Sequence, residues 1–157
     1  MLEPGTNAPD FTLATTQDNS FTLSKNKGKR TILAFYPADW SPVCTDQMSL
    51  YNEMLDYFSN LNATLVGISV DGKWCHAAFS HNRKLDFPLL SDFERKGFVS
   101  KKYEAFDDQA GESFRALFVI DENGFIRWTY LSPPNANPGA DGIIQALEEL
   151  NQQQLMK

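Results

Sequence analysis

Cysteine is scarce in this sequence of 157 residues, which contains only Cys44 and Cys75. Two cysteines do not make the multiple disulfides on which small secreted scaffolds depend, so each is available for reactivity or for burial in a reducing cell. No apolar run approaches the roughly 18 residues that span a bilayer, and the first ten residues lack a basic start and an apolar stretch. We therefore expect a cytoplasmic protein with no membrane partner.

Positive charge is also in short supply. The chain has 14 Lys and Arg against 20 Asp and Glu, a net charge of −6, and its one basic concentration, over residues 25–30, is typical of a solvated turn. Nucleic acid is therefore an unfavourable partner, because phosphate binding needs a large basic surface. A Gly-rich phosphate loop of Walker or Rossmann form is absent from the sequence.

The composition is that of a globular protein, with 42% hydrophobic and 22% charged residues. Its length predicts a single domain over residues 1–157. Residues 31–36 and 64–70 are apolar stretches typical of buried strands, and a helical pattern lies between them. This strand, helix and strand order predicts a parallel βαβ unit and an α/β fold.

The remaining patterns predict further elements around this unit. Alternating runs at 11–13 and 21–23 predict an N-terminal β-hairpin, and Asn123-Gly124 predicts a second hairpin because this pair tolerates positive φ. Trp74 and Trp128 are expected in the core. The other expected elements are a helix over 73–85, an extended stretch at 87–90, a helix over 94–104, strands at 114–121 and 125–131, and an amphipathic helix containing residues 143–150.

Cys44 occupies the position where a thiol loses its proton most readily. Pro37 ends the strand that precedes it, Ser41 fits a helix N-cap, and Pro42 fits the first helical position. Cys44 then lies in the first turn, where unpaired N–H groups and the helix dipole favour a thiolate. The alternative is an inert buried thiol that acts as a small apolar residue.

Pro37-x-x-x-Ser41-x-x-Cys44 has the form P-x-x-x-[TS]-x-x-C, and this chain resembles the peroxiredoxins, which are thiol peroxidases. Matching segments at 8–11, 67–71, 87–92 and 118–121 extend the similarity over nearly the whole chain, and the branch resembled is that of bacterioferritin-comigratory-protein-like or AhpE-like members. The resemblance implies a thioredoxin-like three-layer α/β/α sandwich with a mixed central sheet and an added N-terminal β-hairpin. It implies no metal or organic cofactor.

The resemblance also implies roles for individual residues. Cys44 is the peroxidatic nucleophile, Ser41 hydrogen-bonds at the sulfur and the peroxide, Pro37 shields the pocket from water, and Arg115 supplies positive charge. An arginine suits this role because it stays protonated and donates through a rigid fork. The match is weakest at Gln47, where family members often have Glu.

Two other assignments compete with these. Arg127 on the following strand is the second candidate for the active-site arginine, after Arg115. His76 and His81 near Cys75 suggest a metal site, but their spacing fits no closed zinc set.

Cys75 is the candidate resolving cysteine, by resemblance to peroxiredoxins that carry it on the helix after the second strand. Resolution five residues after Cys44 is excluded because Ser49 stands there, and we expect no resolution by a C-terminal cysteine of a partner subunit, since no cysteine follows Cys75. Because a disulfide needs Cα atoms within about 7 Å, we expect local unwinding before the bond forms. The alternative for Cys75 is core packing beside Phe79, in a one-cysteine peroxidase rescued by an external thiol.

The sequence therefore predicts a peroxidase for hydrogen peroxide or small organic hydroperoxides, recycled by thioredoxin or a similar thiol reductant. A thiol–disulfide oxidoreductase is less favoured, because Ser41 replaces the first cysteine of a C-x-x-C pair. A non-catalytic binding module on the same fold is the third hypothesis. The sequence leaves monomer and homodimer open.

Overall fold

The computed structural model describes residues 1–16 and 18–156. Among these residues, seven strands form one sheet in the order β2-β1-β5-β4-β3-β8-β9. The strands are β1 (Thr12–Ala14), β2 (Ser20–Thr22), β3 (Arg30–Phe35), β4 (Ala63–Ser69), β5 (Leu89–Ser91), β8 (Ala116–Ile120) and β9 (Ile126–Leu131). Gln17, in the segment that joins the first two strands, lies outside the described residues.

Strand β3 is the centre of the sheet, and all six of its residues are buried. It runs parallel to β4 on one side and antiparallel to β8 on the other, so the sheet is mixed. The expected βαβ unit is confirmed, since β4 follows β3 through a helical crossover and pairs with it in parallel. The predicted N-terminal hairpin is β1 and β2, and it joins the sheet through β5.

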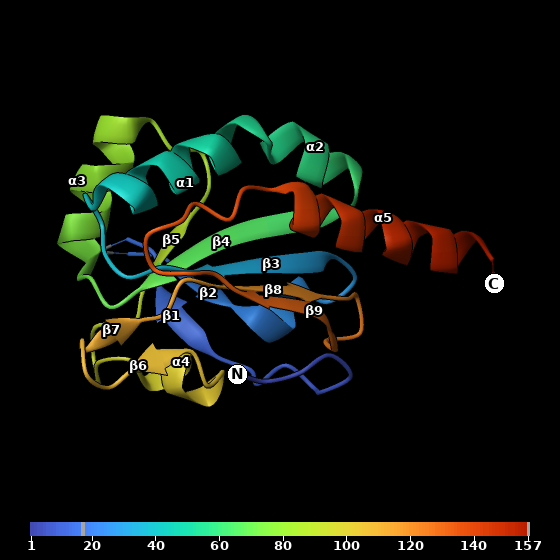
Figure 1. Cartoon of the computed structure of the whole chain (residues 1–157), viewed down its shortest axis with the longest axis horizontal. Helices are drawn as coiled ribbons and strands as arrows, with labels where there is room; N and C mark the ends of the chain where they lie inside the picture. The colour runs from blue at the N-terminus through green and yellow to red at the C-terminus, as the bar shows by residue number, and fades with distance from the viewer. Residues whose placement is uncertain (17, 157) are drawn as a thin grey trace.

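Helices cover both faces of this sheet (Figure 1). One face carries α1 (Pro42–Glu53), α2 (Leu55–Asn60), α3 (Lys73–Arg83) and α5 (Asp141–Leu155). The opposite face carries α4 (Phe98–Lys102) and a small sheet of β6 (Phe106–Asp107) and β7 (Glu112–Ser113), and a 3-10 helix, η1 (Leu23–Asn26), follows β2. These layers confirm the predicted thioredoxin-like α/β/α sandwich.

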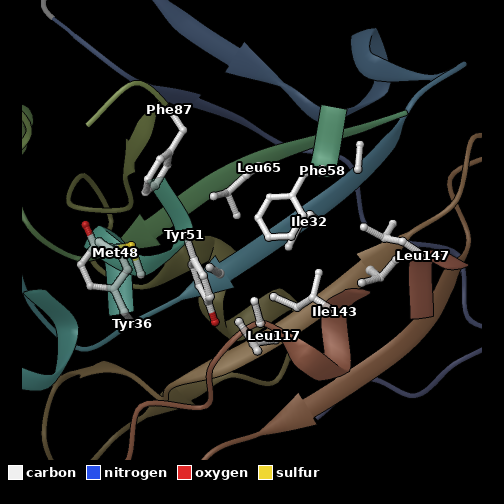
Figure 2. Close-up of a cluster of buried hydrophobic side chains, with 14 of the residues drawn as sticks. Ile32, Tyr36, Met48, Tyr51, Phe58, Leu65, Phe87, Leu117, Ile143 and Leu147 are labelled. Atoms are coloured by element: carbon white, nitrogen blue, oxygen red, sulfur yellow. The ribbon is translucent and has the colours of Figure 1, made fainter. Parts of the chain in front are cut away.

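The larger apolar cluster lies between the sheet and the helices α1, α2, α3 and α5. Figure 2 shows Tyr51 and Phe58 of the first two helices facing Ile32 of β3, with Ile143 and Leu147 of α5 beside them. Tyr51 lies on the buried side of α1 and Phe58 on the buried side of α2.

Several sequence predictions fail at element ends. The helix that begins near Cys44 is two helices, separated at Met54, whose φ is −98° and ψ 2°. The helix expected over 94–104 is only α4, because Gly97 has a φ of 75° and Asp92 caps the turn by accepting from the backbone N–H groups of Val99 and Ser100.

The prediction of a core role for Trp74 is also wrong. Its side chain is 66% exposed, because α3 packs on the sheet through His76 and Phe79 instead. Trp128, in contrast, packs partly buried against the larger cluster. The second hairpin is confirmed around Gly124, whose φ is 89°. Within the described residues, no helix has the length and apolar character to cross a membrane.

Candidate active site

The candidate site begins where β3 ends. Pro37 follows the strand half-buried, and the chain then turns through Trp40, whose φ of 72° is unusual for a residue with a side chain. Helix α1 starts at Pro42, and Ser41 is its N-cap, with its Oγ accepting from the backbone N–H of Cys44 at 3.4 Å. The predicted cap is confirmed, and Cys44 lies in the first helical turn.

Arg115 reaches the same point from the neighbouring strand. The register pairs Phe35 of β3 with Ala116 of β8, so Arg115 lies beside the end of β3. Its Nη1 donates to Sγ of Cys44 at 3.2 Å, and the two side chains are 3% and 0% exposed. A fixed guanidinium in a place with little water interacts strongly with a thiolate, because the local dielectric is low.

The guanidinium is held by two further contacts. Nη1 also donates to Oε1 of Gln47 at 2.7 Å, and Nη2 donates to the carbonyl of Pro134 at 3.1 Å. Nε is buried and has no hydrogen-bond partner among the described residues. Arg115 therefore keeps its Nε available to donate, at a site where its positive charge meets no carboxylate within the described part of the chain.

A second chain of hydrogen bonds extends from Gln47 along α1. Its Nε2 donates to the hydroxyl of Tyr51 at 3.1 Å, and that hydroxyl donates to the carbonyl of Gly139 at 3.0 Å. Burial raises the pKa of Tyr51 to about 12, so the phenol stays protonated and can donate. Sequence reasoning missed Tyr51 as a site residue. Its spacing of four from Gln47, which sets both on one helix face, was the available signal.

Cys75 lies in a different environment, near the start of α3. Its Sγ and carboxylate oxygens of Asp39 and Asp71 lie within 4.8 Å of one another. Burial, followed by the negative charge of Asp39, raises the pKa of the Cys75 thiol to about 11. At neutral pH this thiol is therefore protonated and a poor nucleophile. Both cysteines are free.

Asp39 joins the turn before α1 to helix α3. Its carboxylate accepts from the hydroxyl of Tyr36 at 2.6 Å and lies 2.7 Å from Nδ1 of His76. The other ring nitrogen of His76 lies 3.1 Å from the carbonyl of Leu90, and the backbone N–H of Asp39 donates to Asp71 at 2.8 Å. No sequence pattern indicated this network, since its two halves, Asp39 and His76, are 37 residues apart in the chain.

The competing residues are found elsewhere. Arg127 is 42% exposed and donates to Gln153 at 2.9 Å, so the arginine beside Cys44 is Arg115, as expected. Among residues 1–16 and 18–156, the group whose donor atoms lie close enough to share a cation contains Asp39, Asp71 and Cys75, and it includes neither histidine. His76 is committed to Asp39, and His81 is exposed.

A thioredoxin-like sheet with one buried thiol at a helix start, and a serine in place of the first C-x-x-C cysteine, is typical of the class of thiol-dependent peroxidases. The sulfur has a donor beside it and no adjacent thiol with which to exchange a disulfide. Comparison with known proteins agrees with this class.

The model of the AhpC/TSA family matches residues 4–129, and the chain belongs to that family. Alkyl hydroperoxide reductase E of Mycobacterium tuberculosis is 35% identical over 135 residues, which cover 85% of this chain and 88% of the relative. Peroxiredoxin 2 of Thermoplasma acidophilum is 32% identical over 152 residues, with 93% and 75% covered.

Solved structures give the same result. The reduced 2-Cys peroxiredoxin of Plasmodium vivax has a TM-score of 0.88 at 28% identity and covers 96% of this chain and 83% of its own. Peroxidoxin BcpB of Mycobacterium tuberculosis has a TM-score of 0.87 at 27% identity, with 96% and 99% covered. The protein is a peroxiredoxin, a thiol-dependent peroxidase that acts on peroxides and is recycled by thiol reductants.

Proposed function

We propose that Cys44 is the peroxidatic residue and that it reduces hydrogen peroxide or a small organic hydroperoxide. The observation that carries this assignment is the 3.2 Å contact from Arg115 to a sulfur at a helix N-terminus. The high pKa of Cys75, about 11, supports the same choice, because that thiol is almost wholly protonated at neutral pH.

In the proposed step, the Cys44 thiolate attacks the terminal oxygen of the hydroperoxide and the O–O bond breaks. Sulfur loses two electrons and becomes a sulfenic acid, while the departing alkoxide or hydroxide takes a proton and leaves as alcohol or water. Negative charge moves from sulfur to the leaving oxygen. The unpartnered Nε of Arg115 and the N–H groups of the first turn of α1 are the donors that suit this change.

Cys75 is the proposed resolving cysteine. Its thiol attacks the sulfur of the Cys44 sulfenic acid, so a disulfide forms and the hydroxyl leaves as water. Because Cys75 contacts Asp39 rather than the arginine site, the first turn of α3 opens before this attack. A thioredoxin-like dithiol then reduces the disulfide. A cytoplasmic location stays a prediction, as does a state that is either monomer or homodimer.

The test is intact mass after one equivalent of hydrogen peroxide, with stopped-flow measurement of the first step. We expect rapid oxidation, abolished in Cys44→Ser, and a loss of two hydrogens in the wild type. Cys75→Ser should instead gain one oxygen. If Cys44 reacts no faster than free cysteine at the same pH, the assignment of Cys44 is wrong.

The same masses test the resolving step. A wild-type product that gains one oxygen would mean a one-cysteine cycle with an external thiol. A doubled mass would mean a disulfide between subunits. Either result would remove Cys75 as the intramolecular resolving residue and leave the role of Cys44 intact.

A further inference from the structure

We propose that Tyr51 is a positioning residue for the active-site arginine, because it holds the Gln47 amide with its oxygen toward Arg115. The inference rests on the proposed role of Cys44 and adds a residue from farther along the same helix. Cys44, Gln47 and Tyr51 follow one another at steps of three and four, so they share one face of α1.

The direction of the hydrogen bonds is fixed at both ends of this chain. A guanidinium can only donate and a backbone carbonyl can only accept. Between them, the donors run from Arg115 to Gln47 at 2.7 Å, from Gln47 to Tyr51 at 3.1 Å and from Tyr51 to the Gly139 carbonyl at 3.0 Å. The Tyr51 hydroxyl is the group on this path that accepts a hydrogen bond from the Gln47 amide and donates its own hydrogen to the Gly139 carbonyl.

A glutamine needs this help where a glutamate would not. An amide has one accepting and one donating end, and a half-turn of the Gln47 amide would place its NH2 against the guanidinium. Gln47 is fully buried, so water does not compensate a misplaced or unpartnered amide. A carboxylate offers two oxygens and is correct in either orientation.

The neutral amide also has an electrostatic consequence. It accepts from Arg115 without adding a negative charge, so the charge of the guanidinium stays available to the sulfur 3.2 Å away. If the amide moves, Nη1 of Arg115 loses its shortest contact and its fixed position at Cys44. The thiolate and the leaving oxygen would then meet a less well-ordered donor.

Packing in the core is the simpler explanation for a tyrosine at residue 51. A substitution that removes only the hydroxyl distinguishes packing from the positioning role. The ring lies in the apolar cluster (Figure 2) and meets Phe58 edge-on, with centroids 6.5 Å apart. Tyr51→Phe keeps this ring and removes only the hydroxyl. An effect on the reaction at Cys44 therefore reports the hydrogen bond and not the volume of the side chain.

The experiment is a double-mutant cycle of Tyr51→Phe with Gln47→Glu, read as the second-order rate of Cys44 oxidation by hydrogen peroxide at pH 7. In the wild-type background we expect Tyr51→Phe to slow oxidation about tenfold, the effect of one buried hydrogen bond. In the Gln47→Glu background it should change the rate by less than about twofold, since a carboxylate needs no orientation. The Tyr51 hydroxyl has one hydrogen, so in the Gln47→Glu background it donates either to the carboxylate or to the Gly139 carbonyl, and melting temperatures of all four proteins record the effect of that exchange on the fold.

Tyr57→Phe is the matched control, because it removes the hydroxyl of an exposed tyrosine on α2 that donates to Glu148 at 2.7 Å. It should leave the rate unchanged, and melting temperatures identify any loss of folded protein. An equal loss in both backgrounds, or a Tyr51→Phe rate within twofold of the wild type, would overturn the positioning role. A wild-type Cys44 that fails to react would overturn the proposed function first.

Discussion

Removal of the Arg115 guanidinium is the perturbation that examines the site most directly. Arg115→Gln takes away the donor that lies 3.2 Å from Sγ of Cys44 and its positive charge. A hydrogen bond to a charged group contributes about 1.5–3 kcal/mol, which corresponds to a rate decrease of about 10- to 150-fold. Because Arg115 has no carboxylate partner among the described residues, the change leaves no buried carboxylate uncompensated.

Arg115→Lys separates charge from geometry. The ammonium keeps the positive charge but lacks the planar fork that reaches Cys44, Gln47 and the Pro134 carbonyl together. We expect its rate to lie between those of the wild type and Arg115→Gln. A lysine variant as slow as the glutamine variant would show that the fork, and not the charge alone, is required.

The assay is stopped-flow oxidation by hydrogen peroxide under pseudo-first-order conditions, with melting temperatures as a check on folding. Arg127→Gln is the control, because it removes a surface arginine from β9 and should change the rate by less than twofold. The reasoning fails if Arg115→Gln stays within threefold of the wild-type rate, or if Arg127→Gln is equally slow.

Four further predictions address other parts of the structure. Since the pKa of Cys75 is raised to about 11, its alkylation in Cys44→Ser should accelerate about tenfold per pH unit from pH 7 to 10; a plateau below pH 9 would contradict this. In the same background, Asp71→Asn should speed the alkylation of Cys75 at pH 8 about fourfold, which is the effect of removing one negative charge within 4.8 Å at the dielectric constant of water. An unchanged rate would refute this contact. Asp92→Ala removes the cap of α4 and should lower the free energy of unfolding in urea by about 1–2 kcal/mol. Gly67→Ala should cost about 1–3 kcal/mol in the same assay, because its Cβ would lie 2.9 Å from Leu89, and an unaffected midpoint would be inconsistent with that packing.

Local signals account for what the sequence predicted well. Ser41 and Pro42 define the start of α1 with short-range chemistry, and Asn123-Gly124 defines its hairpin in the same way. The order of strand, helix and strand was enough to predict the parallel pair of β3 and β4, because a helical crossover allows few ways of pairing the two strands.

The wrong predictions concern features that the spacing of apolar residues does not report. The apolar spacing of Tyr51, Leu55 and Phe58 continues across Met54, so it did not indicate the break between α1 and α2. Trp74 has an apolar side chain but faces solvent. Which side chains of α3 are buried depends on which side of the helix packs against β5. Periodicity does not contain that information.

The site was predicted in part. The resemblance to the peroxiredoxins named Cys44, Ser41 and Arg115, and the structure brings them together, while their catalytic roles stay proposals. The partners of Asp39 and Gln47 were missed because His76 is 37 residues from the first and Arg115 is 68 from the second. Contacts over such distances follow from the sheet register, which local patterns do not determine.

The Asp39 network connects the turn before α1 to the start of α3 through hydrogen bonds. Its carboxylate receives Tyr36 on one side and meets His76 on the other, so helix α3 cannot carry Cys75 away without releasing that histidine. Formation of a Cys44–Cys75 bond would therefore require the contact between His76 and Asp39 to be rearranged, so the redox state of the sulfurs would be coupled to the attachment of α3 to this turn.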